Sequence, residues 1–190
     1  TDEVPSPFEV TYEHRTYRLR RYFPDLVPTT KRQRLARPPV VLVPPMMLSA
    51  DVYDVAPAIS AVAHLAAAGI DPWVVDFGAP ENEEGGLERT LTDHVLAVSD
   101  AVDRVREQTG RDVHLGGYSQ GGMFCYQAAA YRRSVGLTSV VTFGSPADTS
   151  GMVPFGIPED VAGRVLGLVA DNLQLWGLPS WASSLGFKLM

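Results

Sequence analysis

Apolar and polar residues alternate along the first part of the chain. Residues 8–14 and 16–22 both place apolar side chains at about every second position, which is the spacing of a strand with one buried face. These two segments predict amphipathic strands that meet at a turn and form an antiparallel edge of a sheet.

Strand and helix patterns alternate through the middle of the chain. Four segments have the length and apolar content of strands: 40–43, 72–76, 113–117 and 137–143. Three segments carry apolar residues at helical spacing: 57–68, 87–109 and 123–131. Gly69 and Gly110 follow the first two helices, as helix-ending glycines do. This order predicts an α/β domain with a mostly parallel sheet and helices on both of its faces.

Apolar residues continue after residue 150, but no strand is evident there. They gather in residues 161–168 and 173–190, which include two tryptophans. We interpret 151–190 as the start of an apolar helical cap, suited to an acyl chain. The alternative is that these are ordinary helices that pack into a core.

The most informative motif is Gly-x-Ser-x-Gly at residues 117–121, between a predicted strand and a predicted helix. In that context the motif is typical of a nucleophile elbow, a tight turn that exposes a serine above the end of a sheet. Gly117 and Gly121 would remove Cβ clashes, and Ser119 would be the nucleophile. The N–H of Gln120 would donate to an oxyanion. The alternative is a glycine-rich turn that only packs closely.

An acyl-transfer site needs a second oxyanion donor, usually from the loop after the strand next to the nucleophile strand. That loop here begins with Pro44 and Pro45, which have no N–H, so Met46 is the first residue able to donate. We therefore predict Met46 as the second donor; alternatively, the prolines only end the strand. This loop, Ser119 and residues 145–148 should gather at the carboxyl edge of the sheet.

The same glycine-rich turn does not fit a nucleotide site. Glycines 116, 117, 121 and 122 cannot form Gly-x-Gly-x-x-Gly, and no Gly-Lys-Ser/Thr follows. A single cysteine, Cys125, excludes an internal disulfide and provides no metal cluster. We expect neither a cofactor nor a metal ion.

Composition limits the number of domains and the class of protein. A chain of 190 residues with 45% hydrophobic and 20% charged residues fits one soluble domain. Neither a membrane-spanning helix nor a signal peptide is evident, so we expect a cytoplasmic protein that could associate with a membrane surface.

Charge is unevenly distributed along the chain. Residues 1–39 hold eight of the sixteen Lys and Arg residues against five acids, and the rest carries eight bases and seventeen acids. The basic groups at 18–21 and 31–34 could face a phosphate or an anionic membrane, or simply form a solvated surface. The acidic remainder argues against nucleic acid as a partner.

Together, several segments resemble the α/β-hydrolases, and among them the polyhydroxyalkanoate synthase-like branch. The segments that carry the resemblance are 40–46, 69–76, 112–122 and 140–148. The chain is most similar to the lipase-like N-terminal portion of actinobacterial proteins that also carry an acyl-CoA synthetase. The resemblance implies an α/β-hydrolase core, here its N-terminal part at 1–150, followed by the start of a cap at 151–190. It also implies a fused or docked acyl-CoA synthetase as a partner.

Two departures from the family pattern matter. The polymerising synthases use a cysteine nucleophile where this chain has Ser119, which favours hydrolysis or simple acyl transfer over polymer growth. Cys125 cannot replace it, because it lies about 240° around the helix. The family order also places an acid and then a histidine after the serine, yet all four histidines precede Ser119. We expect the histidine and acid outside these 190 residues, with Asp148 either an acid from another strand or a loop cap.

Two functions follow from these patterns. The leading hypothesis is a serine esterase, lipase or acyltransferase that acts on acyl esters or on acyl-CoA and other thioesters through an acyl-enzyme. The other is a catalytically silent hydrolase-like module that binds acyl chains or docks a neighbouring acyl-CoA synthetase.

Overall fold

The computed structural model describes residues 5–26, 37–46 and 48–147. Its strands are β1 (Phe8–His14), β2 (Tyr17–Tyr22), β3 (Pro39–Val43), β4 (Asp71–Asp76), β5 (Val113–Tyr118) and β6 (Leu137–Phe143). Its α-helices are α2 (Ala61–Ala67), α3 (Leu91–Thr109) and α4 (Gln120–Tyr131). Short 3₁₀ turns occupy Pro24–Leu26, Ala50–Tyr53, Pro57–Ile59, Pro80–Asn82 and Gly86–Glu88.

The six strands form one sheet in the order β1-β2-β4-β3-β5-β6. β1 pairs with β2 and β2 with β4 in antiparallel fashion, whereas β4, β3, β5 and β6 run parallel. The antiparallel edge and the mostly parallel sheet predicted from the sequence are therefore confirmed. Because the parallel strands share one direction, their carboxyl ends lie along one edge of the sheet.

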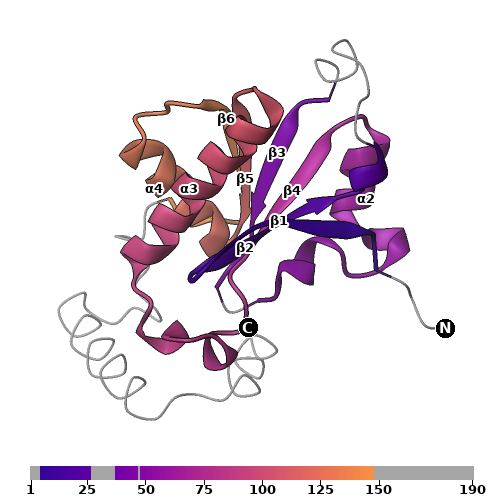
Figure 1. The fold of residues 1–190 in the computed structure, drawn as a ribbon. Helices are drawn as coiled ribbons and strands as arrows, with labels where there is room; N and C mark the ends of the chain where they lie inside the picture. Colours follow the sequence, from indigo (N-terminus) through magenta and orange to yellow (C-terminus); the bar gives the residue numbers. More distant parts are fainter. Residues whose placement is uncertain (1–4, 27–36, 47, 148–190) are drawn as a thin grey trace, which may run out of the picture. The chain divides into compact units, whose positions relative to one another are not determined.

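Helices pack on both faces of this sheet (Figure 1). On one face, α3 and α4 cover a core that contains Val41, Val43, Leu115 and Phe124. On the other face, α2 contributes Val62 to a smaller core. The alternation of β3 side chains between the two cores follows from the two-residue repeat of a strand.

Two predicted helices begin later than their apolar patterns indicated. The first is interrupted: a 3₁₀ turn covers Pro57–Ile59, and α2 starts at Ala61 after Ser60, whose hydroxyl accepts from the Ala63 N–H. The second starts at Leu91 instead of residue 87, because Thr90 and Asp93 form a reciprocal capping box. Hydrogen bonds from N-cap side chains thus determine where both helices begin.

An arginine fixes the end of α4 to α3. The Arg132 guanidinium is buried and donates to the carbonyl oxygen and hydroxyl of Ser99, each at 2.8 Å, and to both Asp103 carboxylate oxygens, at 2.6 and 2.8 Å. The hydrogen bond from Arg132 holds the pKa of Asp103 below its ordinary value. The ion pair should therefore stabilise the fold only while Asp103 is charged.

We expect Asp103→Asn to lower the stability of the protein by about 1 kcal/mol at pH 7. A carboxyl whose pKa is lowered by folding stabilises the native state above its unfolded pKa, near 4, and loses this effect as pH falls through the folded pKa. The difference in Tm between wild type and variant should consequently shrink below about pH 4. Melting curves from pH 3 to pH 7 test this, and a pH-independent difference would contradict it.

Candidate active site

Ser119 lies at the junction of β5 and α4, at the carboxyl edge of the sheet. Its backbone angles are φ 52° and ψ −120°, a conformation that costs free energy for a residue with a Cβ. The Ser119 N–H donates to the carbonyl oxygen of Phe143 at the end of β6, at 2.8 Å. The strained turn predicted from Gly-x-Ser-x-Gly is therefore present, and Ser119 is half-buried rather than enclosed.

The flanking glycines are required by close backbone contacts. A Cβ on Gly117 would lie 2.5 Å from the carbonyl group of Gly121. A Cβ on Gly121 would lie 2.8 Å from the carbonyl carbons of Val43 and Pro44, and closer still to the Val43 oxygen. These distances are shorter than real Cβ contacts, so the turn packs directly against the end of β3. A third glycine, Gly122, which the motif alone did not indicate, is crowded by side chains instead: a Cβ there would lie 2.8 Å from Ser145 Cβ and 3.0 Å from Thr142 Cβ.

The structure brings Met46 and Gln120 together through a hydrogen bond between the backbone of Met46 and the side chain of Gln120. The Met46 N–H donates to the side-chain Oε1 of Gln120 at 3.1 Å. The Gln120 N–H has no acceptor among the described residues and lies at the start of α4, where helix amides favour negative charge. An oxyanion that uses both amides must therefore displace or share the Gln120 side chain. Sequence reasoning assigned Gln120 only a backbone role.

No histidine of the described residues lies within hydrogen-bonding distance of the Ser119 hydroxyl. Each histidine Nδ1 has another partner: His14 with Thr16 Oγ1 at 3.0 Å, His64 with the Ser60 carbonyl at 2.7 Å, His94 with the Thr90 carbonyl at 2.7 Å and His114 with Ser139 Oγ at 2.8 Å. None of these contacts links a histidine to Ser119, and a histidine and acid outside the 190 residues stay a prediction. Asp148 lies outside the described residues, as does the predicted cap at 151–190.

His94 of α3 and Cys125 of the elbow helix α4 are both buried. The His94 ring stacks on Phe124 at 5.2 Å and meets the edge of Phe77 at 4.9 Å, so it fills core space between α3 and α4. Cys125 is fully buried, and burial raises the pKa of its thiol. A neutral, enclosed thiol is a poor nucleophile, which leaves Ser119 as the only candidate on this turn.

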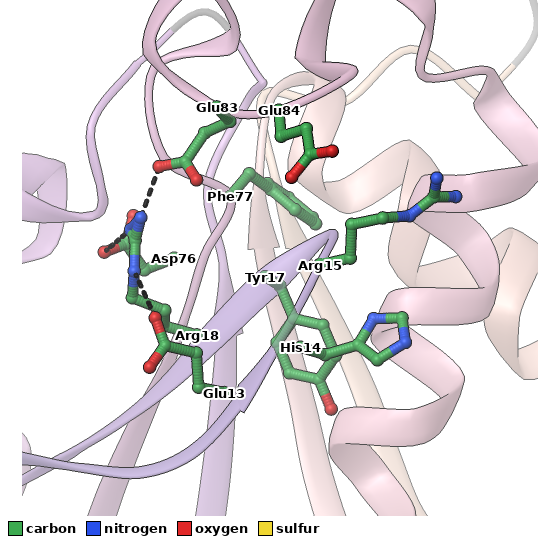
Figure 2. A pocket seen from close by; sticks show the side chains of 9 residues that line it. All are labelled: Glu13, His14, Arg15, Tyr17, Arg18, Asp76, Phe77, Glu83 and Glu84. Atoms are coloured by element: carbon green, nitrogen blue, oxygen red, sulfur yellow. Dashed lines mark hydrogen bonds and ion pairs between the residues drawn. The ribbon is translucent and has the colours of Figure 1, made fainter.

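A charged pocket of about 350 Å³ lies beside the β1–β2 hairpin, at the carboxyl end of β4 (Figure 2). One of its two guanidinium groups, that of Arg18, is paired with three of its four carboxylates. Arg18 contacts Glu13 at 3.4 Å and Asp76 at 3.7 Å, and also forms an ion pair with Glu83. Four carboxylates thus face two guanidinium groups in this pocket, and neither Glu84 nor Arg15 has an ion pair among the described residues.

The neighbouring arginines of β2 are paired as well. Arg20 binds Asp76 at 2.6 Å and Asp51 at 2.7 Å, and Arg21 binds Asp71 at 3.0 Å. Neither expectation for residues 18–21, an anionic partner or a solvated face, describes these half-buried ion pairs. The basic group at 31–34 lies outside the described residues.

An apolar groove of about 520 Å³ runs along the sheet face on the side of α2. Leu42, Tyr53, Leu65, Val141 and Phe143 are among the residues that line it. Val141 and Phe143 are substantially exposed, since β6 has a strand neighbour on one side alone within the described residues. The groove is a place where an apolar chain could be accommodated.

Among the residues that the structure describes, no group of three or more His, Cys, Asp or Glu side chains is placed to bind a metal ion. None of the described helices has the length and apolar character needed to cross a bilayer.

Residues 40–188 match the Alpha/beta hydrolase family, a span that includes β3 to β6 and the elbow. This chain belongs to the alpha/beta hydrolase family. The fold is the α/β-hydrolase fold, in which a serine on a Gly-x-Ser-x-Gly turn occupies the end of a central parallel strand. The fold predicted from the sequence is thereby confirmed.

Solved α/β-hydrolases show the same arrangement of elements. VinJ superposes with a TM-score of 0.51 at 22% identity, over 96% of this chain and 60% of VinJ. The Francisella virulence factor BioJ gives a TM-score of 0.53 at 13% identity, over 80% of this chain and 48% of BioJ. At such identities the likeness concerns the fold.

One curated relative is similar in sequence. The Poly(3-hydroxyalkanoate) polymerase subunit PhaC of Haloferax mediterranei is 29% identical over 151 residues, which cover 78% of this chain and 29% of PhaC. This α/β-hydrolase chain thus spans less than a third of that relative, and less than two thirds of VinJ and BioJ.

Proposed function

We propose that this α/β-hydrolase is a serine esterase, lipase or acyltransferase that acts on long-chain acyl esters or thioesters. The observation that carries the proposal is the strained backbone of Ser119, held at the carboxyl edge of the sheet by a turn that only glycines permit. Strain of this kind persists where the surrounding structure enforces it, and it is common at reactive residues. The free N–H of Gln120 beside it supports acyl chemistry.

The proposed reaction proceeds through an acyl-enzyme. The Ser119 oxygen attacks the substrate carbonyl carbon while a base outside the described residues removes its proton. The N–H groups of Gln120 and Met46 stabilise the negative oxygen. The carbonyl carbon then loses the alcohol or thiol, which takes up the proton, and water or another acceptor releases the acyl group.

Three features support an acyl substrate. The similarity to a hydroxyalkanoate polymerase subunit favours a branch of the family that handles acyl esters and thioesters. The groove on the α2 face is lined by apolar side chains, and residues 151–190 are rich in apolar residues. Because position 119 carries a hydroxyl, we propose hydrolysis or single acyl transfer in place of polymer growth.

Reaction of the full-length protein with a fluorophosphonate probe tests this proposal directly. Trypsin should release residues 112–132 as one peptide, since arginine precedes and ends this segment and neither lysine nor arginine lies within it. Fragmentation of the labelled peptide is expected to place the adduct on Ser119. An adduct on another residue, or none at a probe concentration that labels a known serine esterase, would refute the nucleophile assignment.

The second candidate function is a silent module that binds acyl chains or docks an acyl-CoA synthetase. Two observations favour it. The Ser119 hydroxyl has no basic partner among the described residues, and the apolar groove offers room for an acyl chain whether or not a reaction takes place. It predicts that the protein binds a long-chain fatty acyl ligand in calorimetry, with no turnover and no change on Ser119→Ala. Ester hydrolysis that depends on Ser119 would exclude it.

A further inference from the structure

Tyr53 connects the two segments that build the proposed site. It ends the 3₁₀ turn Ala50–Tyr53 and is buried in the core on the α2 side of the sheet. Its hydroxyl donates to the carbonyl oxygen of Val43 at 2.7 Å and accepts from the N–H of Tyr118 at 3.1 Å. Val43 is the last residue of β3, and Tyr118 directly precedes Ser119.

The hydroxyl takes the place of a missing bond between strands. β3 and β5 are paired from Val40 with His114 up to Val43 with Gly117, and their pairing stops there. Beyond that pair the Tyr118 N–H points towards β3, whose chain has already turned into Pro44 and Pro45. Without the Tyr53 hydroxyl, the buried Val43 carbonyl and the half-buried Tyr118 amide would be left without these partners, which is costly.

Opposite sides of the elbow are therefore held by different acceptors. The Tyr118 N–H is bound on the β3 side by Tyr53, and the Ser119 N–H is bound on the β6 side by the Phe143 carbonyl at 2.8 Å. Successive amides of a strand point to opposite neighbours, so both bonds are needed to fix the turn. Burial raises the pKa of Tyr53, so the phenol keeps the proton that it donates to Val43.

We propose that Tyr53 is a positioning residue for acyl transfer, whose hydroxyl sets the spacing between the nucleophile elbow and the oxyanion loop. This inference rests on the proposed function of Ser119. Val43 is followed by the 44–46 segment, so a fixed Val43 carbonyl also fixes the place of the Met46 N–H. The Tyr53 hydroxyl contacts two backbone groups and no reacting atom.

Loss of the Tyr53 hydroxyl should destabilise the transition state more than it weakens substrate binding. The attacking oxygen and the oxyanion donors belong to different segments, and their relative position matters most when the carbonyl becomes tetrahedral. A looser connection should therefore lower kcat and leave KM nearly unchanged.

Tyr53→Phe removes only the hydroxyl and is the decisive variant. In the full-length protein we expect kcat for a p-nitrophenyl ester to fall about tenfold, with KM within about twofold of wild type. The rate of fluorophosphonate labelling at Ser119 should fall in parallel. A variant with a lower Tm but wild-type kcat would show a purely structural role and overturn the proposal.

Tyr17→Phe is the matched control. Tyr17 is equally buried, and its hydroxyl donates to Asp100 at 2.7 Å, between β2 and α3 and away from the elbow. We expect it to lower Tm without changing kcat. If Tyr17→Phe lowers kcat as much as Tyr53→Phe, the effect is general loosening and the proposal is wrong.

A measurement on the wild-type protein keeps the proposal testable if Tyr53→Phe does not fold. The Tyr118 amide should exchange with deuterium as slowly as the amides of the β5 core, although no strand carbonyl accepts from it. Fast exchange at Tyr118 would show that the Tyr53 bond is absent in solution and would overturn the proposal. Lack of Ser119 labelling in wild type would instead refute the proposed function, so the two failures are distinguishable.

Discussion

Ser119→Ala is expected to lower kcat for ester or thioester hydrolysis by at least about 10³-fold and to abolish fluorophosphonate labelling. The substitution removes the oxygen that is proposed to attack the substrate carbonyl. What remains is the oxyanion site and substrate binding, which by themselves retain only a small part of the acceleration. Steady-state kinetics of the full-length protein with a p-nitrophenyl ester measures the loss.

The fold should be unaffected by this change. The Ser119 side chain makes no hydrogen bond to other described residues, and alanine relieves little of the strain at φ 52° because it keeps a Cβ. Tm should therefore stay within about 2 °C of wild type. Cys125→Ala is the matched control on the same helix: its buried thiol is not a nucleophile, so activity should persist. Activity that survives Ser119→Ala would exclude the serine mechanism.

Gly121→Ala should destabilise the protein strongly by adding a single methyl group to the elbow. The new Cβ would lie 2.8 Å from the carbonyl carbons of Val43 and Pro44, both backbone atoms that cannot rotate away. The elbow and β3 must then separate, which we expect to cost about 3 kcal/mol of stability, or roughly 10 °C in Tm. The same displacement would separate Ser119 from Met46 and slow fluorophosphonate labelling at least about tenfold.

Gly110→Ala separates this steric effect from the general cost of replacing a glycine. Gly110 ends α3 with φ +69°, and a Cβ there would meet no atom within 4 Å. Its replacement should cost only the backbone penalty, about 1 kcal/mol, and leave labelling unchanged. Melting curves and labelling rates of both variants provide the comparison. Equal effects at the two positions would mean that the elbow does not pack tightly against β3.

Much of the fold could be predicted from the chain because its signals are local. The antiparallel edge, the parallel strands and the elbow follow from the two-residue repeat, from short apolar runs and from a five-residue motif. The predicted helix starts were less accurate. Residue 87 continues the apolar spacing of α3 towards the N-terminus, but the Thr90–Asp93 capping box begins the helix at Leu91. Within this helix the apolar Leu91 is exposed, whereas the polar His94 is buried.

By itself, the sequence determined the order of elements, the position of the nucleophile turn and the two loops expected beside it, because each depends on neighbours along the chain. The tertiary structure decided how those loops are joined. Tyr53 lies 65 residues before Tyr118 in the chain, and Gln120 lies 74 residues after Met46, yet each pair shares a hydrogen bond. No periodicity relates residues so far apart, since only the packing of strands β3 and β5 brings a phenol and a carboxamide to the same edge of the sheet.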